Sequence, residues 1–305
     1  MLRKLIKQGQ NALTITLPAK WLKAMNLQAG SEINLSETNQ NLIISTDSKK
    51  IPKEAELKIS SEQEFMIRGR LTNIYGMGFD KIKVYFQNQK QEVAVKEVVR
   101  NFMMGFEVTE DKGNWLIVEN VAEPSGEKQE SLTRRIFLIT LEAFSIILTD
   151  LRNNQFENKD LILERSRKVF EYFNFCRRNI STRRFTDEYV CIFWGFYDNI
   201  FRVQTVLNNL YQHLAEKKSV QLSSKSLQLF KQIEKSYQGI YEGFFEYNTE
   251  KLYLAAESLR ELQETKLLEE LSEAEEPIVI YYFLRIARDA ALASSCAIEL
   301  TNSES

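Results

Sequence analysis

Glycine and proline are distributed unevenly along this 305-residue chain, and their distribution limits the folds open to it. Eight of the eleven glycines lie in residues 1–126, and no proline occurs between Pro124 and Pro277. Both residue types mark turns and disfavour the interior of helices. We therefore expect a region of short elements to give way to a domain of long helices near Pro124-Ser125-Gly126.

The first 48 residues predict a small β-rich domain. Ala12–Leu17 alternates apolar and polar residues with the period of two that is typical of a half-buried strand. The predicted elements are strand Arg3–Lys7, strand Ala12–Leu17, helix Ala19–Met25 opened by Pro18, strand Glu32–Ser36 and strand Asn41–Ser45. Such a domain has too small a core to be stable alone, so we expect it to dimerise.

A small α/β module is expected in residues 49–124, beginning at the junction marked by Pro52. The predicted order is strand Ala55–Ile59, helix Glu62–Ile74, strand Lys81–Phe86, helix Val93–Phe102, strand Phe106–Glu110 and strand Trp115–Val121. Gly76 and Gly78 end the first helix, and Gly105 ends the second.

Residues 125–305 predict an all-α domain. Apolar residues between Leu132 and Leu151 recur at the i, i+3, i+4 spacing of a core-facing helix. Further helices are predicted over residues 159–180, 187–216, 223–247, 249–264 and 277–300, and their short loops indicate antiparallel neighbours. The similarity between Phe156–Leu161 and Tyr247–Leu252 suggests two three-helix units.

Features that would direct the chain to a membrane or support catalysis are scarce. Apolar runs fall short of the ~20 residues of a membrane span, and no signal-peptide pattern begins the chain, so we expect a cytoplasmic protein without membrane insertion. His213 is the single histidine, and Cys176, Cys191 and Cys296 are widely spaced, which favours buried thiols. We expect no enzymatic activity, no catalytic residue and no cofactor; an enzyme using carboxylates is the remaining catalytic alternative.

Two motifs near the N-terminus resemble the AbrB/SpoVT/MazE family of swapped-hairpin DNA-binding domains. Leu17-Pro18-Ala19-Lys20-Trp21 follows the alternating strand, and Leu27-Gln28-Ala29-Gly30-Ser31-Glu32-Ile33 follows the predicted helix. Asn26 stands where the family pattern has its first glycine, and Ser31-Glu32 replaces the acid that follows the second. The remainder resembles archaeal PhoU-like phosphate uptake regulators, which join such a domain to a small α/β module and a PhoU-like helical bundle.

The resemblance implies a homodimer in which two chains interleave their hairpins and form one positive face that binds duplex DNA. The charge agrees, because residues 1–31 contain five bases and no acid although the whole chain has a net charge of −2. The candidate DNA-binding residues are Arg3, Lys4, Lys7, Lys20 and Lys23 for phosphates, and Gln8, Asn11 and Thr14 for base edges or sugars. A domain used only for dimerisation, with ordinary surface lysines, is the alternative.

The PhoU-like resemblance also implies metal sites made from acids four residues apart, but most of these acids are missing. The residues four positions after Glu164, Asp198 and Asp289 are Lys168, Arg202 and Ala293. We expect Lys168 and Arg202 to form i, i+4 ion pairs with the preceding acids and the chain to bind no metal cluster. Glu257 and Glu261 are the remaining metal candidates.

Two further clusters have structural interpretations. An aromatic band is expected to pack mainly in the core, with an apolar partner surface as the alternative; it consists of Phe170, Tyr172, Phe173, Phe175, Phe193, Trp194, Phe196, Tyr197 and Phe201. Four arginines are expected to form a solvated patch near a helix C-terminus, with a phosphate or DNA contact as the alternative: Arg177, Arg178, Arg183 and Arg184.

Together these features favour a DNA-binding transcriptional regulator linked to phosphate uptake. Its helical domain would sense a signal or dock a protein partner. The alternative is a PhoU-like signalling adaptor that docks on a transporter or kinase and uses the N-terminal domain only to dimerise.

Overall fold

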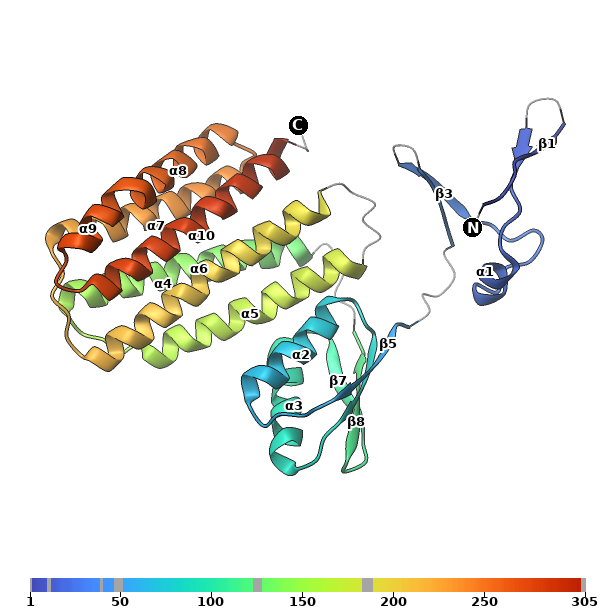
Figure 1. Cartoon of the computed structure of the whole chain (residues 1–305), viewed down its shortest axis with the longest axis horizontal. Coiled ribbons are helices and arrows are strands. Elements are labelled where there is room, and N and C mark those ends of the chain that lie inside the picture. The colour runs from blue at the N-terminus through green and yellow to red at the C-terminus, as the bar shows by residue number, and fades with distance from the viewer. Residues whose placement is uncertain are drawn as a thin grey trace. The chain divides into compact units, whose positions relative to one another are not determined.

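The chain divides into two units, Met1–Pro52 and Lys53–Ser305, which we call the head and the body. The computed structural model describes residues 2–9, 12–38, 41–46, 52–122, 128–182 and 189–302. Short strands predominate in the head, whereas the body joins a four-stranded α/β module to long helices (Figure 1). The predicted change from short elements to long helices is confirmed.

Two antiparallel hairpins and one short helix form the head. Its elements are β1 (Ile6–Gln8), β2 (Ala12–Thr14), α1 (Ala19–Ala24), β3 (Asn34–Thr38) and β4 (Asn41–Ser45). Strands β1 and β2 are shorter than predicted, because pairing within one chain runs only from Ile6 opposite Thr14 to Gln8 opposite Ala12. Gly9 follows β1 with a φ of +74°, which glycine adopts without strain.

Asn26 ends helix α1 in the left-handed conformation, with a φ of +52°. Its N–H donates to the carbonyl oxygen of Lys23 (3.2 Å), and the N–H of Leu27 donates to that of Leu22 (2.9 Å). These two bonds form the Schellman motif, which usually requires glycine at the left-handed position. Asparagine is among the few other residues that tolerate this conformation, which explains how Asn26 can replace the family's glycine.

The body begins with an α/β module built on a mixed four-stranded sheet. The elements of this module are β5 (Glu54–Lys58), α2 (Glu64–Gly76), β6 (Lys81–Tyr85), α3 (Gln89–Phe102), β7 (Phe106–Asp111) and β8 (Trp115–Asn120). The strand order is β5-β6-β8-β7, with β5 parallel to β6 and the other pairs antiparallel. Leu71 and Tyr75 of α2 and Val95 of α3 are buried with Ile82 and Val84 of the sheet.

Long helices form most of the remaining body. They are α4 (Lys128–Asn153), α5 (Lys159–Thr182), α6 (Val190–Lys217), α7 (Ser224–Phe245), α8 (Thr249–Glu261), a π-helical turn η1 (Leu262–Lys266), α9 (Leu267–Glu273) and α10 (Pro277–Asn302). Helix α6 packs against α10 and α4 against α7, so the two predicted three-helix groups share one hydrophobic core. No helix in the described part of the chain is both long and apolar enough to span a membrane.

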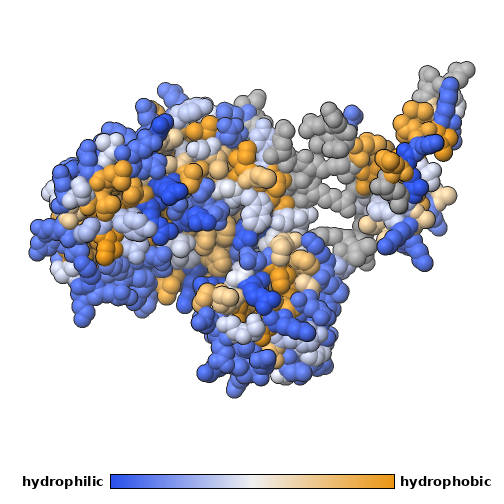
Figure 2. Space-filling view, viewed as in Figure 1, coloured by the Kyte–Doolittle hydropathy of each residue, from blue (hydrophilic) through white to orange (hydrophobic). Residues whose placement is uncertain are grey.

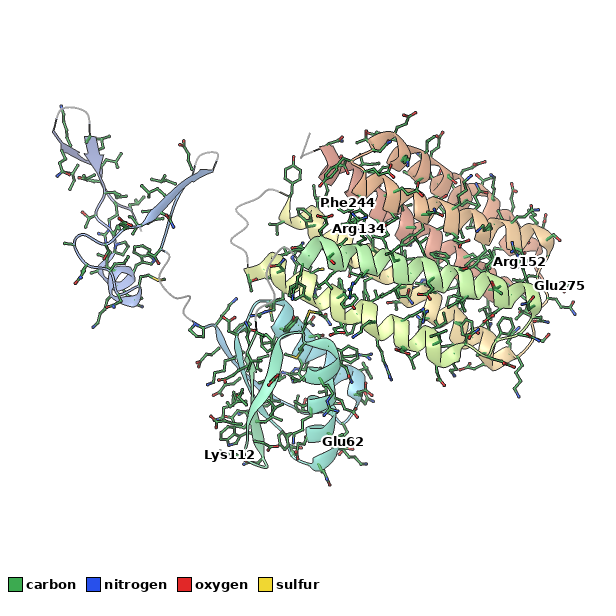
Figure 3. The ribbon with its side chains drawn as sticks, turned by 180° about the vertical axis from the view of Figure 1, so that it is seen from behind. Glu62, Lys112, Arg134, Arg152, Phe244 and Glu275 are labelled. Atoms are coloured by element: carbon green, nitrogen blue, oxygen red, sulfur yellow. The ribbon has the colours of Figure 1, made fainter. Side chains whose placement is uncertain are left out.

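Aromatic side chains contribute much of this core. Phe173 and Phe201 stack with their ring centres 4.4 Å apart. Between α4 and α7, the guanidinium of Arg134 lies 4.0 Å from the ring centre of Phe245, close to Phe244 (Figure 3). The prediction that the aromatic band from Phe170 to Phe201 packs mainly in the core is confirmed, since its nine predicted residues all belong to the core or pack against it.

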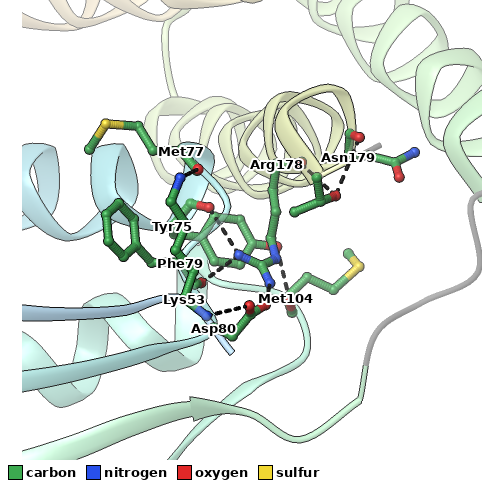
Figure 4. A network of polar contacts seen from close by, with 9 residues as sticks. Lys53, Tyr75, Met77, Phe79, Asp80, Met104, Arg178 and Asn179 are labelled. Atoms are coloured by element: carbon green, nitrogen blue, oxygen red, sulfur yellow. Dashed lines mark hydrogen bonds and ion pairs between the residues drawn. The ribbon is translucent and has the colours of Figure 1, made fainter. Parts of the chain in front are cut away.

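A buried arginine on α5 binds the α/β module to the helices (Figure 4). Arg178, which is 3% exposed, donates hydrogen bonds to the carbonyl oxygens of Tyr75 (3.3 Å) and Phe79 (2.6 Å). It also donates to Oδ1 of Asp80 (2.7 Å), while Oδ2 of Asp80 accepts from the backbone N–H of Lys53 (3.0 Å). The first residue of the body is therefore connected to α5 through a single carboxylate.

This network corrects the predicted solvated arginine patch. Arg178 is buried because Asp80 and two carbonyl oxygens from the α/β module replace its hydration. Arg177 lies with its guanidinium 4.6 Å from the ring centre of Trp194. Arg183 and Arg184 lie outside the described residues.

The three cysteines differ in burial. Cys176 is buried, Cys296 is half-buried and Cys191 is exposed in the first turn of α6. Burial raises the pKa of the Cys176 thiol to about 12, which keeps it protonated and unreactive. The predicted burial is confirmed for Cys176 and wrong for Cys191, which faces solvent rather than the core.

A buried carboxylate joins α9 to the start of α7. Glu270 accepts hydrogen bonds from the hydroxyls of Ser223 (2.9 Å) and Ser226, and it pairs with Lys225 (3.1 Å). Ser223 is also the N-cap of α7. Burial alone would raise the pKa of Glu270, but the two hydroxyl hydrogen bonds and the Lys225 ammonium outweigh it, and the pKa lies below its ordinary value.

Replacing Glu270 with glutamine should lower the free energy of unfolding by about 1 to 2 kcal/mol at pH 7, because the hydroxyls lose a charged acceptor. Folding lowers this pKa, so the stabilisation is complete above the glutamate pKa of the unfolded chain and is lost as the pH falls through the folded value. Urea unfolding between pH 7 and about pH 3 measures this loss. The exposed Glu269→Gln is the matched control, and a Glu270→Gln effect that is independent of pH would contradict the account.

Candidate nucleic-acid interface

The β1–β2 hairpin distributes the candidate DNA-binding residues over both of its faces. Opposing residues of an antiparallel pair share a face. Lys7 lies opposite Leu13 on one face, whereas Gln8 and Thr14 lie on the other. The Thr14 hydroxyl donates to the carbonyl oxygen of Ile6 (3.2 Å), so it links the two strands while its lone pairs remain exposed.

All five candidate bases are exposed to solvent. Arg3 and Lys4 precede β1, and Lys20 and Lys23 lie on α1, with Lys23 in its last turn. Within the described residues none of the five bases forms an ion pair, so each is available to a phosphate group. The remaining candidate, Asn11, lies outside the described residues.

Large apolar side chains of the head are exposed to solvent. Among the head residues whose side chains the structure describes, none is buried, and Leu13 and Leu35 are 63% and 60% exposed. The other large apolar residues exposed on the head are Leu2, Leu5, Ile6, Ile15 and Leu42. Figure 2 shows orange hydrophobic patches on the surface of the head. Apolar exposure on this scale is typical of a protein interface.

A hollow beside α1 is lined by both apolar and basic side chains. It has a volume of about 520 Å³ and is lined by Leu22, Lys23 and Leu27, among others. Two leucines in an open hollow can receive an apolar side chain from another chain, with the lysine at the rim. The sequence motifs placed Lys23 in the basic set but gave no sign of this hollow.

The candidate metal residues do not form a cluster. Glu257 and Glu261 are exposed on the α8 surface, and Glu261 pairs with Lys266 (2.9 Å). In the ranges that the structure describes, no three His, Cys, Asp or Glu side chains are grouped closely enough to hold a metal ion.

The two predicted ion pairs in place of metal sites have different outcomes. Arg202 pairs with Asp198 (2.7 Å), which confirms the first. Lys168 pairs with Glu171 (2.8 Å) instead of Glu164, so the second is wrong. Positions three and four residues away are both neighbours on a helix, and Lys168 has an acid at each.

Comparison with known proteins bears on the head. Residues 6–56 match the family model described as "Antidote-toxin recognition MazE, bacterial antitoxin". No curated protein and no solved structure matches the chain. The N-terminal region is therefore a MazE/AbrB-type domain, which fits a DNA-binding or antitoxin-type regulator.

Proposed function

We propose that the protein is a non-enzymatic transcriptional regulator whose head binds duplex DNA as a homodimer. The single observation that carries the proposal is the pairing of two surfaces in one small MazE/AbrB-type domain. One surface is a set of exposed bases without an ion pair to any described residue, and the other is made of apolar side chains that lie exposed in the described part of the head.

Dimerisation would account for both surfaces, because it buries the apolar one and doubles the number of bases on the other. In a dimer with interleaved hairpins, the unpaired ends of β1 and β2 gain strand partners, and exposed apolar side chains such as Ile6 and Leu13 become buried. Two-fold symmetry then doubles the five bases of residues 1–31 to ten. Neutralisation of DNA phosphates by such a set supplies sequence-independent affinity that depends steeply on salt.

The finer parts of the proposal rest on narrower support. A link to phosphate uptake rests on the resemblance of residues 125–305 to PhoU-like domains, and on that alone. The matching family's description names toxin recognition, which supports an antitoxin as a second candidate function. A signalling adaptor with a head used only to dimerise is the third, and DNA binding distinguishes it from the first.

Reversing the charge of Lys7 tests the DNA-binding proposal. Lys7→Glu should weaken binding of the full chain to a labelled duplex about tenfold or more at low salt, whatever the duplex sequence. The slope of log affinity against log salt should also become shallower by about two, one phosphate contact per protomer. Fluorescence anisotropy over a range of salt concentrations measures both quantities.

Lys58→Glu is the matched control, because Lys58 is exposed in β5 of the body and lies outside the basic set. It should leave the affinity for DNA unchanged. Equal affinities for the wild type and Lys7→Glu at low salt would remove the proposed phosphate contacts and favour the adaptor.

A further inference from the structure

A groove runs between α6 and α10 on the surface of the body. Its volume is about 500 Å³, it is partly open to solvent, and the described residues that line it all belong to these two helices. The two helices are antiparallel, since Lys217 at the end of α6 pairs with Glu276 just before α10 (2.5 Å). Figure 2 shows a strongly hydrophilic patch over these helices with apolar patches beside it.

The centre of the groove is basic. Arg202 is neutralised by Asp198 (2.7 Å), but in the described part of the chain Arg285 and Arg288 form no ion pair. Asp289 is half-buried beside them, and this burial raises its pKa despite the arginines around it. The lining holds three arginines and two aspartates, so its formal net charge is +1, and an anion in the groove would meet Arg285 and Arg288 on its basic side.

The ends of the groove are apolar. Tyr281 and Leu292 are 49% and 46% exposed, and both line it. They are eleven residues apart on α10, which corresponds to about 16 Å or three helical turns. The two unpaired arginines lie between them, so the groove presents apolar, basic and apolar segments in order along one helix.

We propose that this groove binds an acidic amphipathic helix of a protein partner, with apolar residues at Tyr281 and Leu292 and carboxylates at Arg285 and Arg288. Charge complementarity selects this occupant. A guanidinium group forms paired hydrogen bonds with a carboxylate. Because the body as a whole has more acids than bases, an acidic helix is attracted to the arginines of this groove more than to the rest of the body.

A helix also fits the groove better than a small anion does. Small molecules bind in concave pockets that cover most of their surface, whereas this groove is open and about three turns long. A single phosphate at the arginines would leave both apolar ends uncovered. A helix lying in the groove uses all three segments, as in other helix-in-groove complexes. The inference goes beyond the proposed function, because it requires no DNA contact by the head.

Selection from a phage-displayed library of random 16-residue peptides on the full chain tests the proposal. Excess unlabelled duplex DNA is present to occupy the head. The expected peptides carry Asp or Glu between two apolar residues about eleven positions apart. Their binding should weaken about tenfold or more for the double variant Arg285→Glu and Arg288→Glu, and it should weaken with added salt.

Arg152→Glu is the matched control, because Arg152 is exposed at the end of α4, on the side of the body seen from behind (Figure 3). It should leave peptide binding unchanged, and circular dichroism should show that all variants are folded. Enriched peptides without acids, or equal binding to the double variant, would overturn the proposal. Release of the peptides by Lys7→Glu but not by the double variant would assign them to the head and would also overturn it. The proposed DNA binding would be unaffected by either result.

Discussion

Replacing Arg178 with methionine should lower the free energy of unfolding of the body by about 3 kcal/mol, because it leaves the half-buried Asp80 carboxylate without its cation. The carbonyl oxygen of Phe79 loses the donated bond in the same step, whereas that of Tyr75 keeps the bond from the N–H of Gly78 (3.0 Å). Methionine keeps most of the apolar stem, so lost packing contributes little. Urea unfolding followed by circular dichroism measures the change.

Two further variants show whether the buried charge is the cause. Arg177→Met removes a neighbouring guanidinium that stacks on Trp194, and it should cost about 1 kcal/mol or less. The double variant Arg178→Met and Asp80→Asn removes the unpaired charge and should recover part of the loss. If Arg178→Met were no more destabilising than Arg177→Met, the network would not hold the module to the helices.

Replacing both Leu13 and Leu35 with aspartate should raise the dissociation constant of the head dimer at least about 1000-fold. Each leucine contributes about 2 kcal/mol when it is buried, and every protomer loses two. The aspartates would also bring unpaired charge into the interface. The head, having lost its partner, should unfold while the body remains folded. Sedimentation velocity of the full chain over a range of concentrations measures the dimer.

Leu254→Asp on α8 is the control, since Leu254 is 61% exposed, as Leu35 is, but belongs to the body. It should leave the dimer intact. A full chain that is monomeric at micromolar concentration, with a folded head, would contradict both this prediction and the proposed dimer.

Elements with strong local signals could be predicted from the sequence. The long helices follow their apolar spacing, and α4 to α6 lie close to their predicted bounds. Where polar residues determine the end of a helix, the predicted boundary differed from the observed one. Helix α3 begins at Gln89 instead of Val93, because Asn88 caps it by accepting a hydrogen bond from Gln91 (3.0 Å) and the first turn carries no apolar residue. The predicted end of a helix near residue 264 was also wrong, because α8 continues through η1 into α9.

Contacts between distant segments could not be predicted in this way. Arg178 lies near the C-terminal end of the amphipathic helix α5. Nothing nearby in the sequence indicates that Asp80 is its partner. The same holds for the α6–α10 groove, because Arg285 and Arg288 look like ordinary surface residues until Asp198 and Arg202 are placed beside them. For the head, the sequence predicts a basic set of DNA-binding residues, which stays a prediction, but it does not predict which apolar side chains are exposed beside that set.

The distance along the chain between Asp80 and Arg178 sets an order of events during synthesis. Ninety-eight residues separate the two partners. A ribosome adding about 5 to 20 residues per second needs about 5 to 20 s to make that segment. The sheet is complete only after Asn120 of β8 has been made. From then until Arg178 is added, the α/β module lacks the helix that neutralises Asp80, whereas the head is already complete. Heads emerging from neighbouring ribosomes on one messenger can therefore pair before either body has finished folding.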